Sequence, residues 1–404
     1  MSLVATCVLS LASAYAATHQ VGPGWAYQLQ NKINQAAPGD TIKLTGDIRM
    51  GKAVTFNKAN LTLDGQGYTI FDDFNGNTFQ VRADGVTIKN TKFQGSTNRN
   101  WRGFIVGYDS VGLTISGCTF NSGMMGLMLP HTPPRNLNFK SNTFNSVWYA
   151  ACWHGREVLA VPGSNDDAKF ARATQAGPLY IDDNQLYGDF QGGLRFDCGN
   201  DGNYTPASNP NHPLRFRVME EPTRFAWFGR SYVRNNTVSG NRRFGIGFAR
   251  GAGVTIQGNR MIISATPDNY IEAIHFENQS ANMDLFDNHV TISHVGSNPA
   301  REISGFGLVS FTDHGAPPRF KWGCKNILVG WGNRVDKKWP LTNGIGLKAQ
   351  NVTNGRFNYL NMSAMTSPSR PYAMATHTEN GWNKPQDRWQ FTFTQVGNNP
   401  VINF

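Results

Sequence analysis

The chain has 404 residues, of which 43 are glycine and only 16% are charged. Helical proteins carry many Lys and Glu residues on their surfaces, so this composition argues against a mainly helical protein and favours many short strands joined by turns. The formal net charge of +10 indicates a polyanionic partner, for which acidic polysaccharide, nucleic acid and anionic lipid are the alternatives.

The first twenty residues, MSLVATCVLSLASAYAATHQ, have the pattern of an export signal. An apolar run is followed by Ala-Tyr-Ala, with small residues at Ala14 and Ala16. This pattern predicts a secretory signal peptide over residues 1–16 that is cleaved after Ala16. The mature protein would then be secreted, either outside the cell or into a periplasm. No later apolar run approaches the roughly 20 residues that span a bilayer, so no membrane partner is expected.

Residues 17–50 are predicted to form an N-terminal cap. Leu29, Ile33 and Ala36–Ala37 recur at helical spacing, and Pro-Gly-Asp and an alternating strand follow them. A short amphipathic helix here would cover the open apolar end of the structure that follows, because an uncovered strand edge invites association.

The rest of the chain repeats one phrase. VTIQGNRM (254–261) recurs in forms such as VTIKNTKF and LTISGCTF, each with a short apolar strand, a turn residue and a second strand. Asn suits the turn because it tolerates left-handed backbone angles, and stacked copies can hydrogen-bond through their amides. The turn residues are Asn90, Cys118, Asn142, Asn184, Asn236, Asn259, Asn288, Asn333 and Asn361.

A second phrase follows most of these turns, as in GFIVGY, GLRFDC, GIGFAR and AIHFEN. Three strands per coil predict an all-β protein: a single-stranded right-handed parallel β-helix of about ten coils with an N-terminal capping helix. The β-helix is expected over 51–375, with a tail over 376–404 that packs on it. A leucine-rich repeat is not expected, because the regular Leu spacing it needs is absent. A propeller is not expected either, because it would need about 40 residues per unit.

The cap, the Asn turns and the coil length resemble the pectate-lyase-like superfamily, and the cap is most similar to chondroitinase-B-like alginate lyases and mannuronan epimerases. The resemblance implies that AIHF lies on the first sheet of the coil, where members of that superfamily bind saccharide. The Asp-Pro-His element of the epimerases is absent. Calcium stays open as a metal, although no clear acidic cluster that could bind it stands out, and no cofactor is expected to be required.

Strand alternation then gives the direction of each side chain on the first sheet. Ile274 and Phe276 point inward, and His275 and Glu277 point outward. Applied to the other coils, the same register predicts these outward pairs: Ile105/Gly107, Met128/Pro130, Cys152/His154, Arg195/Asp197, Gly247/Ala249, Val309/Phe311 and Gly346/Lys348. The Gly247/Ala249 rung is expected to be a floor on which a sugar could lie close to the backbone.

Three insertions, at 155–177, 198–230 and 293–325, are expected to leave the coils beside this sheet and to form the walls of a cleft. They are rich in arginine, and Arg pairs bidentately with carboxylates. The substrate-binding candidates from these walls and the sheet are Arg156, Arg217, Arg224, Arg250, Asp197 and Glu277.

The expected reaction is β-elimination in an acidic, uronic-acid polysaccharide such as alginate. It requires a group that neutralises the substrate carboxylate, a base that removes the C5 proton and an acid that assists the leaving oxygen. Arg195 is the candidate for neutralisation, and His275, oriented by Glu277 or Asp197, is the candidate base. The candidates for the acid are Lys348 and His154.

Other readings of the same residues stay open. Asp197 and Glu277 lie two rungs apart, about 9–10 Å by strand spacing, near the upper end of the roughly 6.5–9.5 Å gap of inverting glycoside hydrolases. A C5-epimerase and a non-catalytic saccharide-binding β-helix are further alternatives. The expected partner is an anionic polysaccharide, not nucleic acid or a membrane, and the protein is expected to be a monomer.

Overall fold

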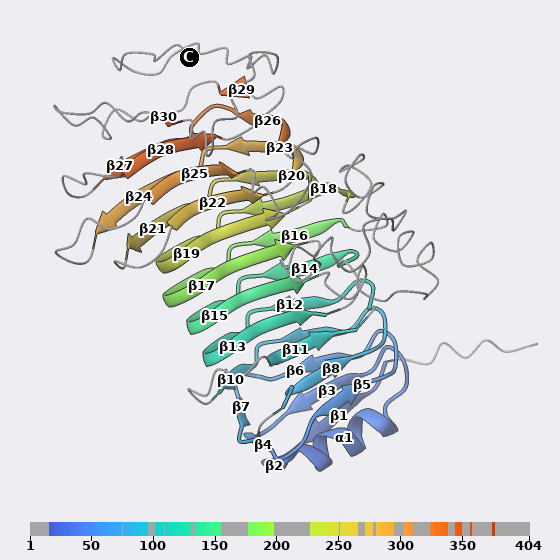
Figure 1. Cartoon of the computed structure of the whole chain (residues 1–404). Coiled ribbons are helices and arrows are strands. Elements are labelled where there is room, and N and C mark those ends of the chain that lie inside the picture. Colours follow the sequence, from blue (N-terminus) through green and yellow to red (C-terminus); the bar gives the residue numbers. More distant parts are fainter. Residues whose placement is uncertain are drawn as a thin grey trace, which may run out of the picture.

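Parallel strands follow one another in coils along the whole described chain (Figure 1). The structure is a computed structural model. It describes residues 16–74, 76–95, 102–108, 110–130, 134–154, 177–197, 227–249, 251–265, 271–277, 280–294, 303–309, 324–337, 344–349, 356–357 and 374–375. All the strand pairs among them are parallel, each strand pairing with the equivalent strand of the next coil, so the predicted right-handed parallel β-helix is confirmed.

Each coil contributes one strand to the second sheet, the sheet that precedes the Asn turn. This sheet has twelve strands, a few more than the ten coils expected from the sequence. Its strands are β1 (Thr18–Val21), β3 (Thr41–Leu44), β6 (Thr62–Asp64), β9 (Thr87–Lys89), β12 (Thr114–Ser116), β14 (Leu137–Lys140), β16 (Leu179–Asp182), β18 (Trp227–Arg234), β20 (Ala252–Gln257), β23 (Ala281–Phe286), β26 (Lys325–Val329) and β29 (Arg356–Phe357).

The other strands form a third sheet after the turn and a first sheet beyond it. The third sheet contains β2 (Gly24–Trp25), β4 (Ile48–Met50), β7 (Thr69–Asp72), β10 (Lys92–Gln94), β21 (Arg260–Ala265), β24 (His289–His294) and β27 (Arg334–Lys337). The first sheet contains β5 (Val54–Phe56), β8 (Phe79–Val81), β11 (Gly103–Gly107), β22 (Ile271–Glu277), β25 (Ile303–Val309), β28 (Gly344–Ala349) and β30 (Met374–Ala375).

In the central coils these two sheets are joined. There a third-sheet strand and the following first-sheet strand form one strand of 11 to 13 residues, so these coils have two strands and not the three expected. The long strands are β13 (Thr119–Leu129), β15 (Thr143–His154), β17 (Gln185–Asp197) and β19 (Thr237–Ala249).

A small residue lies where the first sheet begins in these coils. At this corner two consecutive residues are buried, as Ala150 and Ala151 are in β15 and Ala273 and Ile274 in β22. A methyl group on Gly245 would lie 3.2 Å from the carbonyl oxygen of Ala273, so the strands at the corner approach closely. The corner residues of successive coils are Gly126, Ala150, Gly193, Gly245, Ala273 and Gly305.

The predicted asparagine ladder is present and fully buried from Asn142 to Asn333. From Asn142 to Asn288, each amide nitrogen donates to the side-chain oxygen of the next Asn, as from Asn236 Nδ2 to Asn259 Oδ1 at 2.9 Å. It also donates to a backbone carbonyl, as from Asn259 Nδ2 to Val233 O at 2.9 Å. Because every rung repeats these bonds, the buried amides are satisfied and the ladder holds neighbouring coils in register.

The reason given for asparagine at these positions needs a correction. The residue with left-handed backbone angles is the one before the ladder residue, with φ from 51° at Asn90 to 76° at Gly332. Asn90 is therefore not a ladder member, and the buried Thr91 occupies that place. Asn in the ladder is selected by its hydrogen bonds, not by its backbone freedom.

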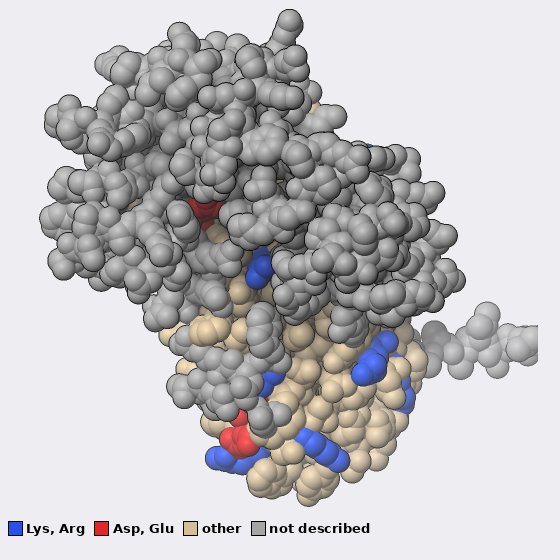
Figure 2. Space-filling model, in the orientation of Figure 1, with Lys and Arg blue, Asp and Glu red and all other residues tan. Residues whose placement is uncertain are grey.

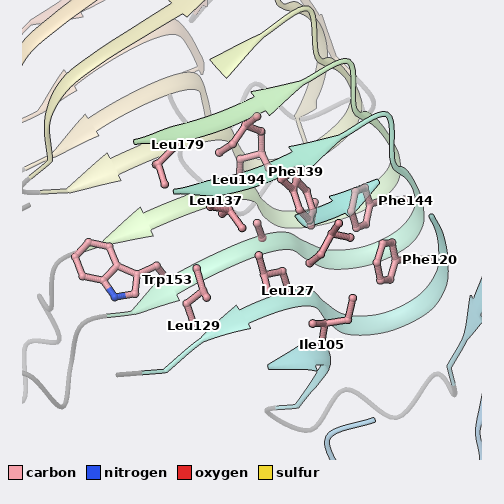
Figure 3. Close-up of a cluster of buried hydrophobic side chains, with 14 of the residues drawn as sticks. Ile105, Phe120, Leu127, Leu129, Leu137, Phe139, Phe144, Trp153, Leu179 and Leu194 are labelled. Carbon is pink, nitrogen blue, oxygen red and sulfur yellow. The ribbon is translucent and has the colours of Figure 1, made fainter. Parts of the chain in front are cut away.

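The core fills the space between the three sheets (Figure 3). Phenylalanine rings stack from coil to coil, with centroids 4.8 Å apart between Phe93 and Phe120 and 4.7 Å apart between Phe120 and Phe144. Figure 3 shows Phe120 next to Phe144, with Leu127, Leu129 and Trp153 of the first sheet further along the same core. Burial of such side chains is the main stabilising contribution to the coils.

The predicted capping helix is confirmed as α1 (Ala26–Gln35), with Leu29 and Ile33 fully buried. Ala36 is buried as expected, whereas Ala37 is exposed. The side chain of Gln30 pairs with the backbone of Thr55 in β5, accepting from its N–H at 2.7 Å and donating to its carbonyl at 3.0 Å. Gln30 thus occupies the place of a neighbouring strand and closes this edge of the first sheet.

Parts of the predicted organisation fall outside the described residues. These are residues 1–15 of the expected signal peptide, the expected tail 376–404, Asn361, and most of the first two insertions. Within the range 293–325, expected as the third insertion, β25 (Ile303–Val309) forms a rung of the first sheet.

Candidate active site on the first sheet

A single column of outward residues crosses the first sheet through the central coils. Strand pairing places Arg195 beside Gly247, Gly247 beside His275, His275 beside Gly307, and Gly307 beside Lys348. Arg195, His275 and Lys348 are therefore two rungs apart in turn, which corresponds to about 9–10 Å between their backbones. Glycine occupies both intervening rungs.

A second column of paired backbone positions runs parallel to the first. It contains His154, Asp197, Ala249, Glu277 and Val309, paired rung by rung. The predicted two-rung separation of Asp197 and Glu277 is thus confirmed for the backbone. Of His154, Asp197, Glu277 and Lys348, the structure describes only the backbone.

The predicted register is wrong in one early coil of this face, whereas Met128 holds its expected place in the column of Cys152 and Arg195. Ile105 pairs with Leu127 and is fully buried in the core, so it points inward. Gly107 pairs with the buried Val81 and also belongs to the inward register. The outward residue of that coil is Val106, because it pairs with Met128.

The register also needs correction in the late coils. Val309 pairs with Glu277 and not with His275, so Gly307 and Val309, and not Val309 and Phe311, hold the two positions of this rung. Lys348 lies in the column of His275. Gly346 is the corner residue of that coil and not an outward one.

Glu272 is a partner of His275 that the sequence pattern does not predict. Its Oε2 atom is hydrogen-bonded to His275 Nδ1. The Glu272 and His275 side chains are 10% and 7% exposed, so the pair lies in a largely water-free environment. The expected partners were Glu277 and Asp197; Glu272 is the carboxylate that the structure places on the imidazole.

Phe244 holds the other side of the imidazole. The two rings stack with centroids 5.2 Å apart and an interplanar angle of 9°. Phe244 is paired with Glu272 across the strands, so both partners of His275 come from the row of residues just before the corner. The ring is thus fixed on one face by Phe244 and on one edge by Glu272.

The glycines of the column make room for these two partners. A methyl group on Gly247 would lie 2.7 Å from the Phe244 ring, and one on Gly307 would lie 2.3 Å from the Glu272 carboxyl carbon. The expectation that the Gly247 rung is a floor for a sugar is therefore wrong, because the Phe244 ring occupies that space.

Apolar side chains lie on the same outer face in the coils that precede Arg195. Met124, Met125, Tyr149 and Cys152 form a buried cluster separate from the core, with Met128 and Trp148 packed against it. Cys152 is the neighbour of Arg195 in the column. The outer face thus changes from apolar to polar at Arg195, which is half-buried.

The corner explains why simple alternation did not find Glu272. Counting back from His275 by twos makes residue 272 an inward position. At the corner, however, both Ala273 and Ile274 are buried in the core, so the alternation shifts by one residue. A small residue followed by an aliphatic residue recurs at the corner, as in Gly245–Ile246 and Ala273–Ile274. This pair is the sequence signal that could have revealed the shift.

Neither a metal centre nor a membrane span emerges from the described part of the chain. Within it, no three His, Cys, Asp or Glu residues form a group that could hold a metal ion. None of its helices has the length and apolarity to cross a membrane.

On the face that Figure 2 shows, the Lys and Arg side chains of the described residues are scattered among uncharged and acidic residues and form no continuous basic wall. The arginines expected to build the wall lie outside the described residues: Arg156, Arg217, Arg224 and Arg250.

Comparison with known proteins adds little beyond the fold. No protein-family model matches the chain, and no curated protein matches its sequence. A PL6 alginate lyase solved with a trisaccharide is similar over 87% of this chain and 81% of its own, with 12% identity and a TM-score of 0.40. Alginate lyase AlyF-OU02, solved with G6, is similar over 89% and 84%, with 11% identity and a TM-score of 0.38.

A protein of a different kind is similar to a comparable degree. The Dettilon tailspike protein is similar over 84% of this chain and 63% of its own, with 10% identity and a TM-score of 0.33. The expected resemblance to alginate lyases and epimerases thus reaches no further than the parallel β-helix that the strand pairing already shows.

Proposed function

We propose that this protein is a secreted polysaccharide lyase that cleaves an acidic, uronic-acid polysaccharide such as alginate by β-elimination. The observation that carries the proposal is the Glu272–His275 pair on the outer face of the first sheet, with Arg195 two rungs away in the same column. The net charge of +10 favours an anionic glycan over a neutral one. The proposed reaction needs no cofactor and no second subunit.

His275 is the proposed base. Because Glu272 binds Nδ1, the ring carries its proton there, and the lone pair that accepts the C5 proton is on Nε2. The nearby carboxylate then stabilises the imidazolium that forms. Phe244 fixes the plane of the ring, so Glu272 and Phe244 are positioning residues in this proposal.

Arg195 is the proposed group that neutralises the substrate carboxylate. A guanidinium pairs with a carboxylate through two parallel hydrogen bonds, which lowers the cost of negative charge developing at C5. The long Arg side chain can cover part of the two-rung distance, so that one sugar unit reaches both Arg195 and His275.

Protonation of the leaving oxygen is assigned to Lys348 or His154. Lys348 lies two rungs beyond His275 on the side opposite to Arg195. His154 lies in the second column, on the rung before Asp197. Replacement of each residue by Ala distinguishes them. Only loss of the residue that protonates the leaving oxygen should slow cleavage of a polymer whose leaving group is poor.

The site is tested with Arg195→Ala and His275→Ala. Each variant should lose activity by about 100-fold or more and keep the melting temperature of the parent protein within a few degrees. Tyr108→Ala is the matched control, because Tyr108 directly follows β11, an earlier strand of the same sheet, and contacts Arg82. Equal activity in all three variants would place the site elsewhere.

An inverting glycoside hydrolase is the second candidate, because strand pairing puts Asp197 and Glu277 two rungs apart in one column. In that case Asp197→Asn and Glu277→Gln should abolish activity, while His275→Ala should retain it. An epimerase would change the sugar without cutting the polymer, and a binding protein would retain the polymer unchanged.

A further inference from the structure

Asp40 lies at the N-terminal end of the β-helix and receives three hydrogen bonds. Its carboxylate accepts from the backbone N–H of Ala17 at 2.7 Å, from the backbone N–H of Ala37 at 2.8 Å and from His19 Nε2 at 2.7 Å. Only 5% of the residue is exposed. The left-handed Gly39, with φ of 94°, turns the chain so that Asp40 faces the first strand.

These donors favour the charged carboxylate. The hydrogen bond from His19, followed by those from Ala37 and Ala17, lowers the pKa of Asp40 to about 2. Asp40 is therefore ionised throughout the neutral range and presents a full negative charge to the backbone nitrogen of Ala17.

Ala17 is also where the regular fold begins. Its carbonyl accepts a hydrogen bond from Thr41 N at 2.8 Å, and Thr18 starts β1, which pairs with β3. Ala16 and Ala17 are both exposed. Both polar backbone groups of Ala17 are thus bound, and the peptide bond before it is accessible.

The sequence points to the same bond for a different reason. Small residues at Ala14 and Ala16 are the pattern that a signal peptidase requires before its cleavage point. Cleavage after Ala16 would convert the nitrogen of Ala17 from an amide into an α-amino group. This is the atom that Asp40 already binds.

We propose that the Ala16–Ala17 bond is hydrolysed during export and that Asp40 is the binding site for the α-ammonium group this creates. Water adds across the bond, the new carboxylate leaves with Ala16, and the protonated amine remains on Ala17. The hydrogen bond from Ala17 N to Asp40 then becomes an ion pair, which strengthens the attachment of β1 to the first coil after processing. The inference is independent of the proposed lyase activity.

The first test is the mass of the full chain after export from a secreting host. The released protein should begin at Ala17. A mature chain that begins at any other residue would overturn the proposal.

The second test compares the chain that begins at Ala17, released from a cleavable tag, with the same chain acetylated at that nitrogen. Acetylation should lower the melting temperature by roughly 1–3 °C and should have no effect in Asp40→Asn. The α-amino group should also titrate above its usual value of about 8 and return to it in Asp40→Asn.

Asp47→Asn is the matched control, because Asp47 also accepts a backbone hydrogen bond in these coils, from Thr69 N at 2.7 Å. It should leave the effect of acetylation unchanged. An unchanged melting temperature after acetylation of the parent protein would contradict a role for Asp40 in binding the terminus. An equal decrease in the parent protein and in Asp40→Asn would contradict it as well.

Discussion

Glu272 and His275 are three residues apart on β22, yet both lie on the outer face of the strand, with Glu272 Oε2 hydrogen-bonded to His275 Nδ1. In a regular strand, residues three apart point to opposite faces. The shift in alternation at Ala273 brings the two together, so the fold itself builds the pair.

Replacement of Glu272 by Gln should separate positioning from binding. The amide can still occupy the space, but it does not carry the charge that stabilises the imidazolium. We expect kcat to fall by about 10–100-fold with little change in KM, because the carboxylate does not touch the substrate in our proposal. Steady-state kinetics on the preferred polymer measure both constants. An unchanged kcat would mean that the pair is only structural.

Gly307→Ala should disturb the same pair without removing any functional group. The added methyl group would lie 2.3 Å from Cδ and 2.5 Å from Oε2 of Glu272, so the carboxylate has to move. Activity should fall about as far as in Glu272→Gln. Gly22→Ala is the control, since its methyl group would meet nothing closer than Thr45 Oγ1 at 4.0 Å. Full activity in Gly307→Ala would show that the geometry of the pair is unimportant.

The ladder predicts a large effect on stability alone. Asn259→Leu would leave Asn236 N, Asn236 Nδ2 and Val233 O without their partner. Buried groups without partners cost about 1–3 kcal/mol each, so the free energy of unfolding should fall by about 3 kcal/mol or more. Activity should persist until the protein unfolds. Denaturant unfolding measures the loss.

Asn145→Leu is the matched control for the ladder. Asn145 also bonds to an Asn of the neighbouring coil, at 2.8 Å to Asn121, but its side chain is exposed and water can replace the bond. This variant should lose well under about 1 kcal/mol. Equal losses in Asn145→Leu and Asn259→Leu would mean that burial of the ladder is not what makes it stabilising.

These results also show which features of the fold a sequence pattern can predict. Each ladder Asn follows a short apolar strand and repeats once per coil, so the β-helix was predictable from its period. The pattern could not show that Thr91, and not Asn90, belongs to the ladder. The left-handed residue and the ladder residue are adjacent, and both positions favour Asn.

For the site, the sequence predicted the column of Arg195 and His275 because alternation holds beyond the corner. The sequence did not predict the contact of Glu272 with His275, because the residues at the corner do not alternate. It did not predict the contact of Phe244 either, because a ring that fills the space above a glycine depends on contacts between coils. Such contacts are absent from any local pattern.

Asp72 predicts how stability depends on pH. Burial raises the pKa of this carboxyl to about 6, although the charge of Arg102 acts in the opposite direction. The folded protein therefore holds the proton more tightly than the unfolded chain, where the ordinary value is 3.8. Stability should decrease as pH rises from about 4 to about 6 and should remain at the lower value above that range.

Asp72→Asn should remove this contribution, so the decrease between pH 4 and pH 6 should be smaller than in the parent protein. Denaturant unfolding at several pH values measures the difference. Asp73→Asn, which changes the neighbouring and more exposed carboxylate, should retain the decrease. An identical pH profile for the parent and Asp72→Asn would show that Asp72 does not titrate in this range.

The central claim is the reaction class, and the structure of the product tests it most directly. β-Elimination leaves a conjugated double bond between C4 and C5 of the new non-reducing end, whereas hydrolysis leaves none. Alginate, pectate, chondroitin and glucuronan are incubated with the protein while ultraviolet absorbance and reducing ends are followed together. We predict that both signals rise on at least one acidic polymer, that both are lost in His275→Ala, and that added salt weakens both by screening the positive protein. Reducing ends that appear without absorbance would contradict the lyase and favour a hydrolase built on Asp197 and Glu277.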